Sequence, residues 1–239
     1  MKSDTFKASR EAPALRAVIV APAGGVRWVP PLRDVHPLRT VLSGYGGPTG
    51  GASKRALDCA AAAAGLIVLT PLLLLIGLIV RLESRGPALF LQRRGGYRGR
   101  TFLIWKFRTM RSMDDGRVVA QVGEGDPRVT YFGRFLRRTS LDELPQLINV
   151  LKGEMSLVGP RPHAITHDRM FAAMVDNYVE RQSARPGMSG LAQVSGSRGE
   201  TRDLESVRER IKFDLDYIAN WSLWLDLKII AKTIAWTRR

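Results

Sequence analysis

Two adjacent carboxylates, Asp142 and Glu143, are the residues of this sequence best suited to chemistry. They stand at the start of an apolar-faced stretch, Leu141 to Leu151, whose spacing predicts a helix. A local explanation is available, because Ser140 followed by Glu143 has the spacing of a capping box, and the helix dipole favours acidic residues in a first turn. On the local pattern alone, a helix cap is the simpler interpretation.

A concentration of cations around this pair favours a functional interpretation instead. Arginine forks bind phosphate bidentately, and paired carboxylates at a helix N-terminus suit phosphoryl chemistry with a divalent metal. With one cysteine and three histidines in the chain, zinc is a poor candidate and a hard, oxygen-bound metal a better one. Surface charge is the alternative for each cation. The cations are Lys106, Arg108, Arg111, Arg134, Arg137, Arg138 and Arg161.

The overall charge points the same way. The chain has 239 residues, enough for one catalytic unit with additional segments, and carries 37 Lys and Arg against 22 Asp and Glu, a net charge of +15. Such a balance predicts anionic partners: nucleic acid, acidic lipid headgroups or phosphorylated substrates. Charge by itself does not choose among these three classes.

An uncharged segment from Cys59 to Val80 must position this chemistry at a membrane. As a straight helix it would reach roughly 33 Å, enough to cross a bilayer core. Basic residues flank both ends, so both ends favour the cytoplasm. At the midpoint, Pro71 removes an amide hydrogen bond and disfavours helix at Thr70. We therefore expect a re-entrant membrane helix over residues 53–85, broken at Thr70-Pro71. A spanning helix with a proline kink is the alternative.

The rest of the chain predicts a leader and a catalytic domain. Residues 1–52 are rich in Pro, Gly, Ala and Arg without a sustained period, and we interpret them as a disordered leader. Residues 86–239 predict an α+β, mainly helical domain with a small β-hairpin at the membrane face. Trp221 to Trp236 is either an amphipathic interfacial helix or a core helix. The expected strands are Pro87–Arg94 and Thr101–Met110, and the expected helices are Leu141–Leu151, Ala164–Gln182 and Leu204–Ala219.

Three ordered motifs resemble one known family. The run from Asp142 to Pro162, together with Lys106–Met110 and Arg185–Gly196, resembles the bacterial sugar transferases, which are monotopic polyprenyl-phosphate phosphoglycosyl transferases. The resemblance extends from Lys54 to the C-terminus. It implies a re-entrant membrane helix broken near its midpoint, although the family often has serine where this chain has Thr70.

The resemblance also implies roles for individual residues. Asp142 matches the nucleophile that forms an aspartyl phosphosugar and releases a nucleoside monophosphate, and Glu143 matches the second acid. Both would hold Mg²⁺. Phosphate binding is expected at Lys106, Arg108, Arg137, Arg138 and Arg161, and nucleotide binding at Arg185, Pro186, Gly187, Gly190 and Gln193.

The partners implied are a UDP-sugar donor, undecaprenyl phosphate as acceptor and the lipid bilayer, with no nucleic acid. The protein would be monotopic in the bacterial inner membrane with its catalytic domain facing the cytoplasm, acting at the first membrane step of exopolysaccharide synthesis. His163-Ala164 resembles members that transfer glucose 1-phosphate, and galactose 1-phosphate is the alternative. A basic nucleic-acid-binding protein and an inactive membrane scaffold are alternatives of another class. The oligomeric state is left open, with a homo-oligomer among the options.

Overall fold

The computed structural model describes residues 17–20, 26–29, 49–111, 125–197 and 203–237. The chain divides into two units, Met1–Asp34 and Val35–Arg239. In the first unit, β1 (Ala17–Val20) pairs with β2 (Val26–Val29) as an antiparallel hairpin, with Val20 opposite Val26. Most of the predicted leader lies outside the described residues, so its disorder stays a prediction.

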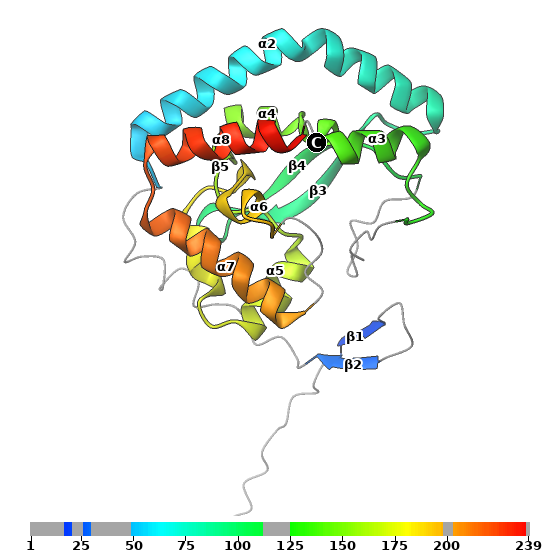
Figure 1. The fold of residues 1–239 in the computed structure, drawn as a ribbon. Helices are drawn as coiled ribbons and strands as arrows, with labels where there is room; N and C mark the ends of the chain where they lie inside the picture. The colour runs from blue at the N-terminus through cyan, green and yellow to red at the C-terminus, as the bar shows by residue number, and fades with distance from the viewer. Residues whose placement is uncertain (1–16, 21–25, 30–48, 112–124, 198–202, 238–239) are drawn as a thin grey trace, which may run out of the picture. The chain divides into compact units, whose positions relative to one another are not determined.

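The second unit contains one long apolar helix, α2 (Gly51–Glu83), which covers most of the predicted membrane segment. Pro71 lies inside it without interrupting it. The Thr70 hydroxyl donates to the Leu66 carbonyl at 2.6 Å, and such back-bonding next to a missing amide donor bends a helix. Figure 1 shows α2 as an arch over the rest of this unit. The expected break at Thr70-Pro71 is thus a bend within a continuous helix.

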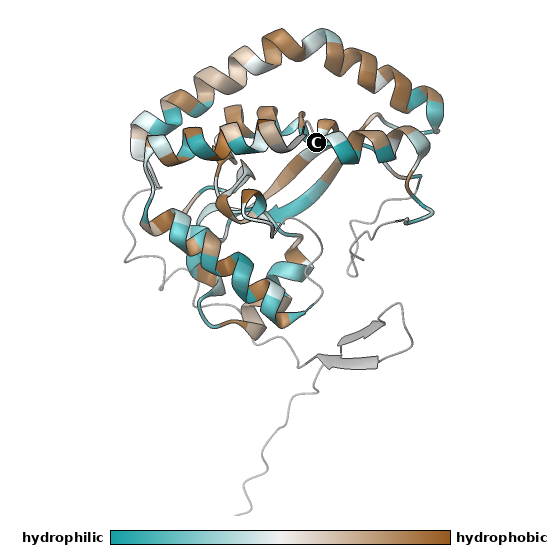
Figure 2. Cartoon of the chain, in the orientation of Figure 1, coloured by the Kyte–Doolittle hydropathy of each residue, from teal (hydrophilic) through white to brown (hydrophobic). Residues whose placement is uncertain are grey.

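One face of α2 is packed and the other is bare. Ala62 packs with Phe102 and Ile104, and Ile76 and Val80 contribute to a second buried cluster. Figure 2 shows that α2 is hydrophobic along most of its length. Among the described residues, α2 is the helix long and apolar enough to cross a membrane, which fits a membrane-associated helix. Its large exposed apolar side chains are Leu57, Ile67, Val68, Leu72, Leu74, Leu75, Leu78 and Leu82.

Both ends of α2 are tied to the same folded unit. At its start, the Lys54 ammonium lies 2.6 Å from Asp226 of α8 (Leu223–Thr237). At its end, Arg108 donates to the Ser84 carbonyl at 2.6 Å, and the Glu83 carboxylate accepts from the Phe132 amide at 2.7 Å. The two ends of the arch therefore meet the same body of protein.

That body is α+β and mainly helical, as predicted. Strands β3 (Leu89–Gly95) and β4 (Thr101–Phe107) form the expected antiparallel hairpin, with Leu89 opposite Phe107, and a 3₁₀ turn, η2 (Tyr97–Gly99), connects them. The sequence did not predict β5 (Ser156–Val158) and β6 (Gly187–Ser189), which pair in parallel. The short helices α3 (Tyr131–Thr139) and α6 (Leu191–Val194) were also not predicted.

The three predicted helices have different outcomes. The prediction of Leu204–Ala219 is confirmed as α7. The stretch predicted as Ala164–Gln182 is two elements, α5 (Ile165–Met174) and the 3₁₀ helix η4 (Tyr178–Ser183), separated where Asp176 and Asn177 favour a turn. The stretch predicted as Leu141–Leu151 is a 3₁₀ turn, η3 (Leu141–Glu143), followed by α4 (Gln146–Lys152). Pro145, which has no amide to donate, stands between these two.

Candidate active site

The carboxylate pair lies in the short turn η3, directly after α3. Ser140 joins the two elements in the left-handed conformation, with φ of 60°, which is uncommon for a residue with a side chain. Its hydroxyl does not cap the following turn, so the capping-box interpretation of Ser140 and Glu143 is wrong. The sharp reversal at Ser140 instead carries Asp142 and Glu143 back towards the end of α3.

Glu143 is saturated by cations. The Lys106 ammonium lies 2.8 Å from Oε1, and Arg161 donates to Oε1 at 2.7 Å and to Oε2 at 3.3 Å. Burial raises the pKa of Glu143, but the charges of Arg161 and Lys106 outweigh it and hold that pKa well below its usual value. Burial has the opposite effect on Lys106 and lowers its pKa, although the negative charge of Glu143 partly offsets this. Glu143 is therefore a fixed anion that holds Lys106 and Arg161 in place.

Asp142 differs from its neighbour. It is 9% exposed, and among the described residues its carboxylate has no hydrogen bond or ion pair. Burial, followed by the charge of Glu143, raises its pKa to about 6, against the opposing charges of Lys106, Arg137 and Arg161. A buried carboxylate with open oxygens and raised basicity is suited to nucleophilic attack on phosphorus.

The structure gathers some of the predicted phosphate-binding cations and not others. Lys106 and Arg161 meet at Glu143, and the charge of Arg137, on the last turn of α3, acts on Asp142. Arg138, on the same turn, is exposed and makes no hydrogen bond or ion pair to the dyad within the described residues. Arg108 is directed elsewhere: its buried guanidinium binds the carbonyls of Val80, Ser84 and Arg85 at the end of α2.

The predicted nucleotide-binding loop is packed mainly against protein. A Cβ on Gly187 would lie 2.1 Å from the Gly159 amide nitrogen, and one on Gly190 would lie 2.4 Å from the Gly159 oxygen. Both glycines are therefore needed for the close approach of two backbone segments. Arg185 donates from Nε to the Gly153 carbonyl at 3.1 Å, and Gln193 donates to the Met188 carbonyl at 3.3 Å. Pro186 lines a cavity of about 10 Å³ beside Pro160, Arg161 and Pro162.

A buried polar network behind Arg161 was not predicted from the sequence. Arg181 of η4 donates from Nε to Asp214 of α7 at 2.9 Å, and the Tyr178 hydroxyl lies 2.7 Å from Nδ1 of His163. Burial, with the charge of Arg181, lowers the pKa of His163 well below its usual value, so this histidine is neutral. No local motif signals the pairing, because Arg181 and Asp214 stand on different helical elements.

The donor set fits Mg²⁺ through Asp142. Among the described residues no group of three or more His, Cys, Asp or Glu side chains gathers around one point. Mg²⁺ is commonly held by one or two carboxylates together with substrate phosphates, which needs no such group. Both oxygens of Glu143 already accept from cations, whereas those of Asp142 are open. The residues present therefore suit an ion bound jointly with a phosphorylated substrate, and a metal contact from Glu143 stays a prediction.

Comparison with known proteins supports the resemblance seen in the motifs. The family model for bacterial sugar transferases matches residues 50–238. The chain belongs to that family. It is 56% identical over 181 residues to the UDP-glucose:undecaprenyl-phosphate glucose-1-phosphate transferase of Caulobacter vibrioides, covering 76% of this chain and 68% of that protein.

Two further relatives are longer proteins. The protein of the same description from Escherichia coli is 49% identical over 181 residues, covering 76% of this chain and 39% of its own length. A UDP-N-acetylgalactosamine-undecaprenyl-phosphate N-acetylgalactosaminephosphotransferase from Aeromonas hydrophila is 45% identical over 183 residues, covering 76% of this chain and 42% of its own length. The chain thus spans less than half of these two relatives.

Proposed function

We propose that this protein transfers a hexose 1-phosphate from a UDP-sugar to undecaprenyl phosphate through a covalent aspartyl-phosphosugar intermediate on Asp142, releasing UMP. The observation that carries the proposal is the contrast within the dyad: Glu143 is saturated by Lys106 and Arg161, while Asp142 has open oxygens and a pKa raised to about 6 by burial and by Glu143. The Caulobacter and Escherichia relatives are named for such a transfer, of glucose 1-phosphate from UDP-glucose to undecaprenyl phosphate.

In the first step, a carboxylate oxygen of Asp142 attacks the sugar-linked phosphorus of the donor. The bond from that phosphorus to the oxygen bridging the two phosphates breaks, and the electron pair leaves with UMP. Attack of an anion on a diphosphate is opposed by charge repulsion. Lys106 and Arg161, whose charges act on Asp142 and which are both held by Glu143, would lower that repulsion. Mg²⁺, held by Asp142 and the donor phosphates, would supply further neutralisation of the diphosphate.

In the second step, an oxygen of the lipid phosphate attacks the same phosphorus. The acyl-phosphate bond to Asp142 breaks, the carboxylate is regenerated, and the product is a lipid diphosphosugar. Glu143, which accepts from both Lys106 and Arg161, would keep these two cations beside Asp142 through both steps.

The membrane arrangement gives this reaction its setting. We infer that the α2 arch enters the bilayer from one side and returns, because both its ends are tied to one folded unit and its outer side chains, such as Ile67 at 76% and Leu74 at 70% exposure, are bare and apolar. Trp224, 64% exposed on α8 with the Lys228 ammonium 5.4 Å from its ring centre, suits the headgroup layer on the same side. Because basic residues flank both ends of α2, we propose that the catalytic domain lies at the cytoplasmic face of the inner membrane.

The sugar is the least constrained part of the proposal. We favour glucose 1-phosphate because two of the relatives are named for it. The Aeromonas relative is named for N-acetylgalactosamine at 45% identity, so similarity of this order does not fix the sugar. Galactose 1-phosphate therefore remains the alternative donor group, within the first membrane step of exopolysaccharide synthesis.

The test is release of UMP from UDP-glucose and UDP-galactose by protein in nanodiscs with Mg²⁺ and undecaprenyl phosphate. We expect UMP and a lipid-linked sugar in equal amounts, and a phosphosugar adduct on Asp142 when the lipid is left out. Turnover without such an adduct would reject the covalent intermediate. Silence with every nucleotide-sugar donor would favour the inactive scaffold, and tight, salt-sensitive binding of nucleic acid would favour the remaining alternative.

A further inference from the structure

The loop that carries Arg161 is held at four consecutive main-chain carbonyls. Pro160 and Pro162 have no amide hydrogen to donate, so the loop has fewer internal donors than an ordinary turn. Each carbonyl from Pro160 to His163 instead accepts from another element. The donors, in order, are the Gly187 amide at 2.9 Å, Arg181 Nη2 at 2.7 Å, Arg94 Nη1 at 3.3 Å and the Gly95 amide at 3.3 Å.

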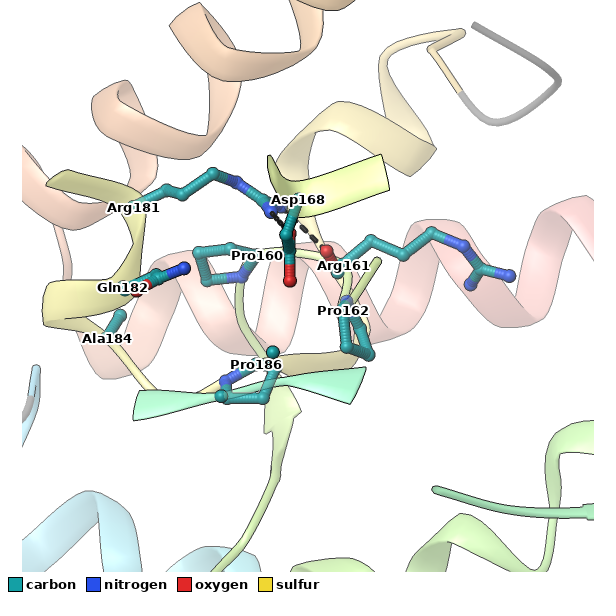
Figure 3. Close-up of a pocket in the computed structure, with 10 residues that line it drawn as sticks. Pro160, Arg161, Pro162, Asp168, Arg181, Gln182, Ala184 and Pro186 are labelled. Carbon is teal, nitrogen blue, oxygen red and sulfur yellow. Dashed lines mark hydrogen bonds and ion pairs between the residues drawn. The ribbon is translucent and has the colours of Figure 1, made fainter. Parts of the chain in front are cut away.

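Arg181 makes the shortest of these four contacts and is itself fixed. It is 4% exposed, and Asp214 of α7 accepts from its Nε at 2.9 Å and its Nη2 at 2.6 Å. Its Nη1 donates to the Tyr178 hydroxyl at 3.2 Å. Figure 3 shows Arg181 reaching the main chain at Arg161, while the Arg161 side chain runs away from the cavity on the other side.

From this geometry we infer that Arg181, held by Asp214, is a positioning residue that sets where the Arg161 guanidinium stands relative to Glu143 and Asp142. The inference rests on the proposed function for its catalytic meaning. Within the described part of the chain, Arg181 makes no hydrogen bond or ion pair to either carboxylate of the dyad, and it acts through the Arg161 main chain. A displacement of about 1 Å at a substrate-binding group can cost about a hundredfold in rate, so this support matters for turnover.

An arginine is required for this double contact. Its planar fork presents separate N–H groups to the Asp214 carboxylate and to the Arg161 carbonyl at fixed angles, whereas a lysine ammonium is a point charge on a flexible stem. Arg181→Lys would keep the buried charge opposite Asp214 but lose the fixed geometry at the carbonyl. The substitution therefore separates positioning from simple charge pairing.

A double-mutant cycle tests the inference. We expect Arg181→Lys to lower kcat/KM for the UDP-sugar by about tenfold to a hundredfold in the wild type, and by less than about threefold when Arg161 is already lysine. If Arg181 acts only through Arg161, its substitution should reduce kcat/KM little further once Arg161 has been replaced. Equal losses in both backgrounds would overturn the inference, since they would show that Arg181 acts independently of Arg161.

Hydrogen exchange gives a second readout that does not depend on turnover. In Arg181→Lys, the peptide spanning residues 158–167 should exchange faster, and the peptide spanning α3 should be unchanged. Arg208→Lys on the exposed face of α7 is the matched control and should leave both peptides and the activity as in the wild type. Should Arg181→Lys fail to fold, Asp214→Asn provides the same comparison. Unchanged exchange in the loop would refute positioning by Arg181, whereas an inactive wild type with altered loop exchange would reject the proposed function alone.

Discussion

Two buried polar clusters in this protein are built from similar residues and differ at one carboxylate. The anchor cluster, Lys54, Asp58, Tyr217 and Asp226, joins the start of α2 to α7 and α8. The second cluster comprises Lys106, Asp142, Glu143 and Arg161 and lies between β4, η3 and the Pro160–His163 loop. We call it the catalytic cluster because the proposed function assigns the chemistry to it.

In the anchor cluster both carboxylates have partners. Asp226 accepts from Lys54 at 2.6 Å, from Tyr217 at 2.8 Å and from the Trp221 indole at 3.2 Å, and Asp58 accepts from the Leu157 amide at 3.2 Å. In the catalytic cluster Glu143 is matched in this way and Asp142 is not. Burial of an ionisable group is common to both clusters, so the open carboxylate is what distinguishes a site for chemistry from a structural pairing.

The largest expected effect is that of Asp142→Asn. Removal of the nucleophile should lower kcat by about 10³-fold or more. The same change should stabilise the fold, because the raised pKa means that folding disfavours the ionised carboxyl. The ionised Asp142 carboxyl lowers the free energy of unfolding. This loss is absent below pH 3.8, the usual pKa of aspartate, grows as pH rises, and is complete above about pH 6, where it reaches at most about 3 kcal/mol.

Denaturant unfolding at pH 8 and at pH 4, beside UMP release, checks both parts of this prediction. A stability gain at pH 8 that shrinks at pH 4 is expected, together with the loss of turnover. If Asp142→Asn were active, or less stable than the wild type at pH 8, then Asp142 would not differ from the paired carboxylates of the anchor cluster.

Asp226→Asn should have the opposite signature. It leaves the Lys54 ammonium, in a residue 6% exposed, without its closest counter-charge, and breaking one partner of a buried pair costs about 3 to 5 kcal/mol. Turnover per folded molecule should stay close to that of the wild type. Glu205→Gln, with a side chain 85% exposed, is the control and should shift stability by less than about 0.5 kcal/mol. A loss of kcat at unchanged stability would show that the anchor cluster takes part in chemistry.

The pH dependence of turnover sharpens the comparison next. If Asp142 is the nucleophile, as proposed, it attacks as the carboxylate. The ratio kcat/KM should then be level well above pH 6 and fall about tenfold per unit well below it, since burial and Glu143 raise this pKa to about 6. The fall should be reversible on returning to pH 7.5. An acid limb centred near pH 4 would mean that Asp142 is an ordinary, solvated carboxyl in the working enzyme.

The sequence predicts contacts between residues of one motif better than contacts between distant parts of the chain. Asp142, Glu143 and Arg161 lie within one motif, and the structure brings them together. The resemblance implied that Lys106 and Arg108 both bind phosphate in one pocket. β4 ends at Phe107, and the Arg108 guanidinium lies at the end of α2 instead of at Glu143.

The contacts that support Arg161 could not be predicted from local motifs. Arg181 and Asp214 belong to separate helical elements, and their pairing depends on how η4 packs on α7. At Thr70-Pro71 the sequence analysis expected a break in the helix, with a proline kink as the alternative, and α2 is continuous there. Proline removes only one hydrogen bond of the helix, and packing of its flanks against the rest of the unit, which the local sequence does not reveal, accompanies the continuity.

Tyr217→Phe should have the smallest effect on stability and turnover, and it tests whether the two clusters are independent. The hydroxyl donates to Asp226 at 2.8 Å and lies 3.0 Å from the Val158 carbonyl, so its loss should cost about 1 to 2 kcal/mol of stability. Asp226 keeps Lys54 and Trp221, which makes this change milder than Asp226→Asn. Val158 lies two residues before Pro160, so Tyr217 contacts the strand that leads into the loop carrying Arg161. We expect kcat within about twofold of the wild type, because the loop carbonyls have their own donors. A larger fall in kcat with stability preserved would mean that the anchor of α2 and the placement of Arg161 form one connected support.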